Sequence, residues 1–210
     1  MTMAEVISVL NNSNKTIKSI CFTGPRPKKL RGYDHDKYVN FVDELTKILI
    51  YITGLFGIEK YISGGAQGFD QLAFWAVNKA KRAVGDTETK NIVYKPFEGH
   101  ELRWLETGLF SRSEYRTMCS MADEVKILSQ GSNDYRTTAK LLDDRNHAMV
   151  DDTDLVIALY PSGNWRTATH SGTANCMKYA AKNNKPILQL LYDENPNNEL
   201  KIIGAALIGA

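Results

Sequence analysis

Short apolar runs alternate with amphipathic stretches along most of the chain, and this alternation limits the possible folds more than any other feature. The apolar runs predict strands at residues 17–23, 58–63, 91–97, 124–128, 154–160 and 186–191. Apolar residues at helical spacing predict helices at 36–53, 67–83, 113–121, 137–150 and 171–183. Strands and helices that alternate in this way form parallel sheets with right-handed crossovers. We therefore expect an α/β fold, a Rossmann-like, doubly wound and mostly parallel sheet flanked by helices.

The most apolar of these runs, DLVIALY at 154–160, has the pattern of a central parallel strand that is covered on both faces. The tail, residues 193–210, begins as a polar loop and ends in KIIGAALIGA, which is apolar enough to need covering. We expect this tail to pack on the sheet edge or on a second copy of the chain. The whole chain is interpreted as one domain, residues 1–210, with residues 1–15 as an N-terminal extension.

Composition excludes several classes of protein. With 43% hydrophobic and 24% charged residues, the chain is typical of ordinary soluble globular proteins. Its net charge of +2, from 26 basic and 24 acidic residues, argues against a protein that mainly coats nucleic acid. The three cysteines and four histidines lack the spacing of a disulfide framework or a metal site. No signal peptide or membrane span is evident, so a cytoplasmic location without membrane contact is expected.

Residues 63–70 read SGGAQGFD and place three glycines between a predicted strand and a predicted helix. Glycine is favoured where the backbone needs positive φ or must approach another group closely. One interpretation is a tight turn; the other is a phosphate resting on free amides at a helix N-terminus. We expect these glycines to serve both purposes.

Loops follow four of the predicted strands, at 24–27, 63–68, 97–100 and 161–173. Because ligands bind beyond the carboxyl ends of parallel strands, these loops should converge on one rim of the sheet. The first contributes Arg26, and the last ends in Ser-Gly-Thr, whose amides and hydroxyls suit a phosphate or merely cap a helix. In outline, the rim is an anion site.

Two charged residues have both a functional and a structural interpretation. Arg145 is a bidentate donor for phosphate or carboxylate, or else forms a surface salt bridge with Asp151 or Asp152. Asp70 lies in the first turn of its helix, where it stabilises the helix N-terminus or hydrogen-bonds a ribose hydroxyl.

Two loop tryptophans lie near the proposed rim. Trp104 and Trp165 either stack on a base or cover the core.

The motifs CFTGPRPKKLRGYD, ISGGAQGFDQLAFWAV, PFEGHELRW, RNHAMVDDTDLVIALYPSG and SGTANCMKYA occur in the order typical of one family. Over residues 17–191 the chain resembles the SLOG superfamily, in particular its bacterial and phage YpsA/YoqJ-like branch. The glycine loop also resembles that of DprA, and the arginine and SGT motifs more distantly resemble the LOG phosphoribohydrolases. The resemblance implies a Rossmann-like fold that binds a nucleotide or nucleotide-derived molecule, in the cytoplasm of a bacterial or phage-infected cell. No other cofactor is required.

The rim and the resemblance together give a set of candidate ligand-binding residues. They are Thr23, Gly24, Arg26, Ser63, Gly64, Gly65, Gln67, Gly68, Asp70, Arg145, Met149, Ser162, Ser171, Gly172 and Thr173.

Two positions depart from the families that the chain resembles. Pro25 replaces the histidine that usually follows the first motif's glycine, and Cys176 stands where LOG enzymes have a catalytic glutamate. Asp70 and Glu98 are the carboxylates that could replace that glutamate, although nothing in the sequence assigns catalysis to either.

Three functions are consistent with these features. The first is capture of a nucleotide-like ligand for sensing or sequestration, as in a phage-encoded sponge for a nucleotide signal, and the missing glutamate favours it. The second is a LOG-like phosphoribohydrolase or N-glycosidase that acts on a nucleoside monophosphate. The third is DprA-like binding of single-stranded DNA, against which the balanced charge argues. A homo-oligomer through the apolar tail is compatible with all three.

Overall fold

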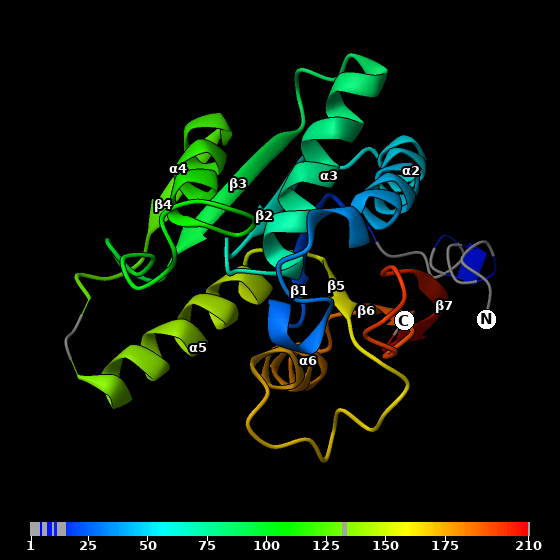
Figure 1. The fold of residues 1–210 in the computed structure, drawn as a ribbon. Helices are drawn as coiled ribbons and strands as arrows, with labels where there is room; N and C mark the ends of the chain where they lie inside the picture. Colours follow the sequence, from blue (N-terminus) through cyan, green and yellow to red (C-terminus); the bar gives the residue numbers. More distant parts are fainter. Residues whose placement is uncertain (1–4, 6–7, 10, 12–15, 132–133, 210) are drawn as a thin grey trace.

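The computed structural model describes residues 5, 8, 9, 11, 16–131 and 134–209, and its centre is a seven-stranded sheet (Figure 1). The strands are β1 (Ser19–Thr23), β2 (Lys60–Ser63), β3 (Lys90–Lys95), β4 (Glu124–Ile127), β5 (Leu155–Leu159), β6 (Ile187–Tyr192) and β7 (Ile202–Ile208). Their order is β4-β3-β2-β1-β5-β6-β7, and every pairing is parallel except that of β6 with β7. The expected α/β, mostly parallel fold is therefore confirmed.

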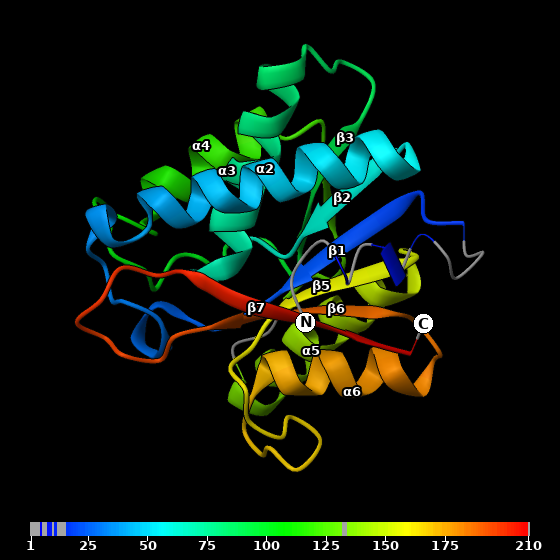
Figure 2. The same ribbon diagram turned by 90° about the vertical axis from the view of Figure 1, so that its right-hand side faces the viewer.

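Helices cover both faces of this sheet. They are α2 (Val39–Phe56), α3 (Phe69–Val84), α4 (Arg112–Met121), α5 (Tyr135–Asp151) and α6 (Gly172–Lys182). Helices α2, α3 and α4 lie on one face and α5 and α6 on the other, as Figure 2 shows. The short 3₁₀ helices η1 (Pro27–Lys29) and η2 (His35–Lys37) lie between β1 and α2.

Two helices begin two or three residues later than the sequence pattern predicts. The helix expected from residue 36 begins at Val39, because residues 35–37 form η2 instead. The helix expected from residue 67 begins at Phe69, because Gly68 has φ 97°, which is outside the helical region.

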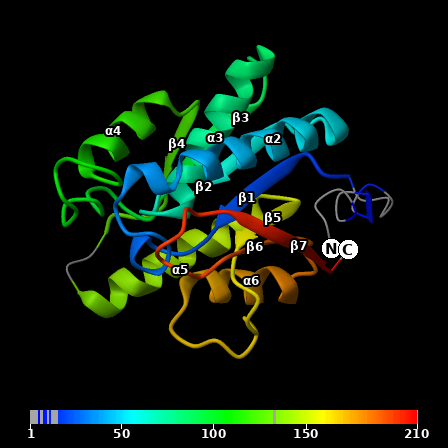
Figure 3. The same ribbon diagram turned by 45° about the vertical axis from the view of Figure 1, so that its right-hand side comes forward.

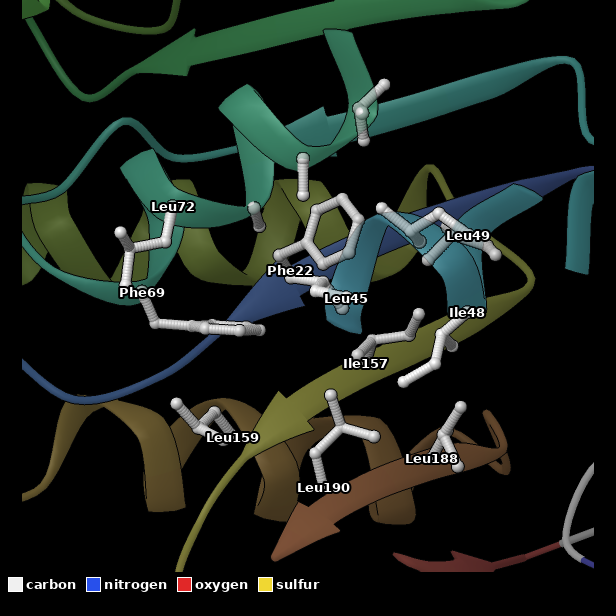
Figure 4. Packing of buried hydrophobic residues seen from close by; sticks show 14 of the residues in the cluster. Phe22, Leu45, Ile48, Leu49, Phe69, Leu72, Ile157, Leu159, Leu188 and Leu190 are labelled. Carbon is white, nitrogen blue, oxygen red and sulfur yellow. The ribbon is translucent and has the colours of Figure 1, made fainter. Parts of the chain in front are cut away.

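Alternating side chains of the interior strands divide the core into two layers. Phe22 of β1 and Ile157 of β5 face α2 and α3, where they pack with residues such as Leu45 and Phe69 (Figure 4). Cys21 faces α5 and α6 on the other side. All residues of β1 and β5 are buried, as expected for parallel strands that are covered on both faces.

The C-terminal tail forms the edge strand β7, which lies antiparallel beside β6 (Figure 3). This confirms that the tail packs on the sheet edge, the first of its two expected positions. Leu200, just before β7, is fully buried and donates its amide to the carbonyl of Lys37. The tail is thus joined to the segment that leads into α2.

Candidate functional site

The strand order reverses between β1 and β5, so the carboxyl ends of these two strands form the switch point of the sheet. The chain proceeds outward from β1 to β4 and then returns to β5 on the other side of β1. In open α/β sheets such a reversal point is where ligands bind. The loops after β1, β2 and β5, together with α5, supply the side chains at this end of the sheet.

Arg145 of α5 is buried beneath this rim, with 4% of its surface exposed. Its Nη1 donates to the carbonyl oxygen of Gly64 and lies 3.8 Å from Oδ2 of Asp70. Asp151 and Asp152 instead contact Tyr179 and Lys60. The interpretation of Arg145 as a partner in a surface salt bridge with Asp151 or Asp152 is therefore wrong. Its guanidinium group lies against the glycine loop instead.

Asp70 is the carboxylate of this buried cluster. Its Oδ2 accepts the amide of Ala66 at 3.4 Å, and Ser63 Oγ donates to its backbone carbonyl at 2.8 Å. Burial raises the pKa of Asp70 above its usual value of 3.8, and the cations of Arg145 and Arg26 partly offset that rise. The carboxylate is held in place, and its protonation is sensitive to any charge that enters the rim.

Each glycine of the loop serves a close approach. A Cβ on Gly64 would overlap the guanidinium of Arg145, and one on Gly65, at φ 64°, would lie 2.6 Å from the Tyr115 ring. A Cβ on Gly68, at φ 97°, would overlap the carbonyl of Pro25. The structure therefore shows the close approaches that were expected of these glycines. All three are buried, because side-chain and backbone atoms of the protein pack directly against the loop.

The first loop packs directly on the second. The amide of Phe69 donates to the carbonyl of Pro25 at 3.2 Å, and a Cβ on Gly24 would lie 2.5 Å from the Cβ of Phe69. Gln67 is held separately, because its Nε2 donates to the carbonyl of Phe110 at 2.7 Å.

Arg26 is the exposed cation above this cluster. The surrounding loops desolvate its head in part, and the guanidinium of Arg145 lies close enough that both effects lower the pKa of Arg26. Two guanidinium groups this close together repel each other, and an anion between or above them relieves that repulsion. Arg26 is thus the rim residue best placed to meet a phosphate from solvent.

The start of α6 presents the remaining candidates. Ser171 caps the helix by accepting the amide of Ala174 at 3.2 Å, as one interpretation of the SGT motif requires. Gly172 and Ser162 are exposed, whereas Thr173 is buried.

Two positions named from the sequence are core residues in this structure. Met149 is 1% exposed and Trp165 4% exposed, and both belong to the apolar cluster between the sheet and α6. Trp165 therefore covers the core, the second of its two interpretations. Met149, a residue of α5, is thus part of the core beneath that helix.

Cys176 lies deep in the site beside Thr23. Burial raises the pKa of the Cys176 thiol to about 12. A hydrogen bond between the side chains of Cys176 and Thr23 opposes this rise, and the charges of Asp70 and Arg145 also act on the thiol. The thiol is therefore protonated and unreactive at neutral pH. Among the carboxylates, Asp70 has the largest electrostatic effect on the Cys176 thiol. Glu98 is exposed and pairs with Lys95 at 2.9 Å.

Sequence reasoning missed a polar cluster beside the glycine loop, which consists of His100, Glu101 and Tyr115. Tyr115 of α4 lies on Gly65, and His100 contacts the Tyr115 ring edge to face, with 5.1 Å between ring centres. Trp104, the other loop tryptophan, packs against both rings. The position of His100 just after β3 was a signal for this cluster, but the contribution of α4 was not visible in the sequence.

Two further features bear on other functions. In the described part of the chain, no three histidine, cysteine or acidic side chains gather as metal ligands would. None of its helices is both long and apolar enough to cross a membrane.

Comparison with known proteins identifies the family of this chain. The YpsA family, described as the YspA SLOG family, matches residues 20–195. The chain is also similar to the uncharacterized SPbeta prophage-derived protein YoqJ of Bacillus subtilis (strain 168), with 29% identity over 130 residues. That match covers 59% of this chain and 70% of the relative. The matched residues include all the loops of the rim, and the chain belongs to the YpsA family of SLOG proteins.

Proposed function

We propose that this protein binds a nucleotide or nucleotide-derived small molecule at the carboxyl rim of its sheet. Family membership suggests a nucleotide-related function. The observation that carries the proposal is that two arginines, exposed Arg26 and buried Arg145, lie close together at the point where the strand order reverses. The phosphate lies against Arg26 and the first turn of α6, where unpaired amides favour negative charge.

Sequestration is the finer form of this proposal. The protonated Cys176 thiol at the position of the LOG glutamate favours binding without turnover. The Bacillus relative is prophage-derived, and a phage protein that removes a host nucleotide signal needs only tight binding. The protein would then act in the cytoplasm as a sponge for that signal.

One observation favours a second candidate, a phosphoribohydrolase. Asp70 is a buried carboxylate with a raised pKa, a property typical of general acids, and its field reaches Cys176. Incubation with a nucleoside monophosphate followed by chromatography separates the two functions. Intact nucleotide supports the binder, whereas free base and ribose 5-phosphate, lost in Asp70→Asn, would establish the enzyme.

Calorimetric titration tests the binding proposal, with adenosine and guanosine 5′-monophosphates, ADP and ribose 5-phosphate as probes. Arg26→Ala is the informative variant, because Arg26 is exposed and its removal leaves the core intact. Loss of one charged hydrogen-bond donor should weaken binding by about tenfold to a hundredfold. Arg145→Ala is less informative, since it also leaves the buried Asp70 unpaired.

The matched control is Arg82→Ala, which removes another exposed arginine at the far end of α3. Its affinities should equal those of the wild type. If Arg26→Ala and Arg82→Ala bind alike, or if no probe binds the wild type, the proposed site is wrong.

A further inference from the structure

Buried polar atoms without hydrogen-bond partners are concentrated beside the glycine loop. Within the described residues, both ring nitrogens of His100, Oε2 of Glu101 and the hydroxyl of Tyr115 are buried and lack a well-formed hydrogen bond, although the Phe97 backbone lies near His100 and the Cys119 thiol lies near the Tyr115 hydroxyl. The side chains of His100 and Glu101 are only 6% and 9% exposed. Each buried group left without a partner costs about 1–3 kcal/mol, so a folded protein seldom keeps several together without a function for them.

Aromatic rings surround the imidazole of this cluster. The His100 ring meets the rings of Phe97, Trp104 and Tyr115 edge to face, with centre separations of 5.9, 5.4 and 5.1 Å. Because Tyr115 in turn lies on Gly65, the cluster borders the loop that contacts Arg145. The unpartnered atoms and the proposed phosphate position thus belong to adjoining parts of one rim.

The cluster combines a neutral imidazole with an acidic side chain. Burial lowers the pKa of His100 to about 3, and the cation of Arg145 adds to this effect, while the Phe97 carbonyl opposes it. A neutral imidazole offers one donor and one acceptor. Oε2 of Glu101 lies 3.6 Å from Nδ1 of His100 and adds a strong acceptor beside it. Such a set matches a planar group that presents a donor next to an acceptor.

We propose that His100, Glu101 and Tyr115 form a subsite that recognises the nucleobase edge of the ligand, whose phosphate lies at Arg26. This inference rests on the proposed function and names the part of the ligand that confers specificity. Because the atoms of the subsite are buried, the proposal requires the segment between β3 and α4, residues 96–111, to move away from the glycine loop when the base enters. A base that presents an exocyclic amino group beside a ring acceptor satisfies the atoms that now lack partners.

The test compares nucleotides with ribose 5-phosphate in calorimetric titrations of wild type, His100→Phe and Glu101→Gln. His100→Phe keeps an aromatic ring in the cluster but removes both ring nitrogens, and His35→Phe, at an exposed histidine, is the control. The wild type should prefer a purine nucleoside monophosphate over ribose 5-phosphate. Both cluster variants should lose about tenfold of this preference and keep their affinity for ribose 5-phosphate.

Thermal unfolding supplies a second readout. His100→Phe removes two unpartnered polar atoms, so its melting temperature should equal or exceed that of the wild type. A purely structural role for His100 would instead lower the melting temperature.

Other outcomes overturn the subsite. Equal loss for nucleotides and ribose 5-phosphate in the variants, or equal wild-type affinity for the two, excludes base recognition but leaves the phosphate site standing. Wild-type affinity for none of the probes removes both proposals. If preference survives in both variants, buried water satisfies these atoms and the subsite is wrong.

Discussion

At the scale of single residues, the contact between Gly64 and Arg145 gives the first prediction. Gly64→Ala places a Cβ where the guanidinium of Arg145 lies and 2.8 Å from Oδ2 of Asp70. The overlap should lower the free energy of unfolding by about 1–3 kcal/mol, measured by chemical denaturation. Gly163→Ala is the control, since its Cβ meets no atom within 4 Å, and it should stay within about 0.5 kcal/mol of the wild type. Equal stability of the two variants would contradict the close approach.

Asp70 gives a prediction about pH. Burial raises its folded-state pKa above 3.8, so the folded protein binds this proton more tightly than the unfolded chain. The contribution of Asp70 to the free energy of unfolding is therefore complete below about pH 3.8 and is lost as pH rises through the folded-state pKa. Asp70→Asn cannot titrate, so its stability relative to wild type should increase from acidic to neutral pH in denaturation series.

Asp86 provides a control of opposite sign. Slight desolvation opposes the shift, but hydrogen bonds from Thr89 and from the amide of Glu88 lower the pKa of Asp86. Its contribution is present above pH 3.8 and is lost as pH falls through the lowered pKa, so Asp86→Asn should lose stability relative to wild type as pH rises. A fall with pH for Asp70→Asn as well would show that ion pairing with Arg145 outweighs burial.

Sequence patterns predict single residues unevenly. The carboxyl-end rule brings Arg26 and the glycine loop together, because it depends only on strand direction. The burial of Arg145 and the position of Tyr115 depend on how α4 and α5 pack on opposite faces of the sheet. Contacts between elements that are distant in the sequence produce no local pattern, so neither feature could be predicted from short sequence motifs.

At the scale of elements, α2 contains a glycine, Gly54, that no close contact of the helix requires. Gly54 is exposed, lies inside the helix and would have no atom within 4 Å of an added Cβ. Gly54→Ala should raise the free energy of unfolding by about 0.5–1 kcal/mol, because alanine loses less backbone entropy in a helix.

The neighbouring Gly57 should respond in the opposite direction. It ends α2 in the left-handed region, at φ 62° and ψ 57°, which alanine adopts only with strain. Gly57→Ala should therefore lower the melting temperature, while Gly54→Ala raises it. Two shifts of the same sign would mean that the boundary of α2 lies elsewhere.

The presence and type of an element could be predicted where the apolar periodicity is strong, as in α2, α3 and β5. The residues at which elements begin and end were harder to predict, because capping hydrogen bonds and single backbone conformations determine them. The helix expected at 137–150 begins instead at Tyr135, since Asp134 caps it by accepting the amide of Thr137 at 2.7 Å.

At the scale of the whole molecule, β7 is the edge strand at one end of the sheet, and among the described residues it pairs with β6 alone. It is the last strand in the order, contains neither charge nor proline, and carries Ile203 at 63% exposure. Such an edge pairs readily with another strand, so we expect a second copy to associate there. Sedimentation velocity should detect a dimer at micromolar concentration and a monomer for Ile203→Lys. A monomeric wild type would remove this idea.

The strand order was less accessible to sequence reasoning than the strand content. Alternation predicts a parallel sheet, but whether the tail pairs with β6 or with another chain depends on contacts across the whole molecule. Leu200 and the Lys37 carbonyl make such a contact, joining positions more than 150 residues apart.

The central claim is that the carboxyl rim binds a nucleotide, and amide chemical-shift mapping tests it most directly. Labelled protein is titrated with adenosine and guanosine 5′-monophosphates while backbone resonances are followed. Nucleotide binding at the rim should produce saturable shifts at the loops after β1, β2, β3 and β5, including Arg26 and Gly172. Shifts confined to another surface, or no saturable shift with either nucleotide, would contradict it.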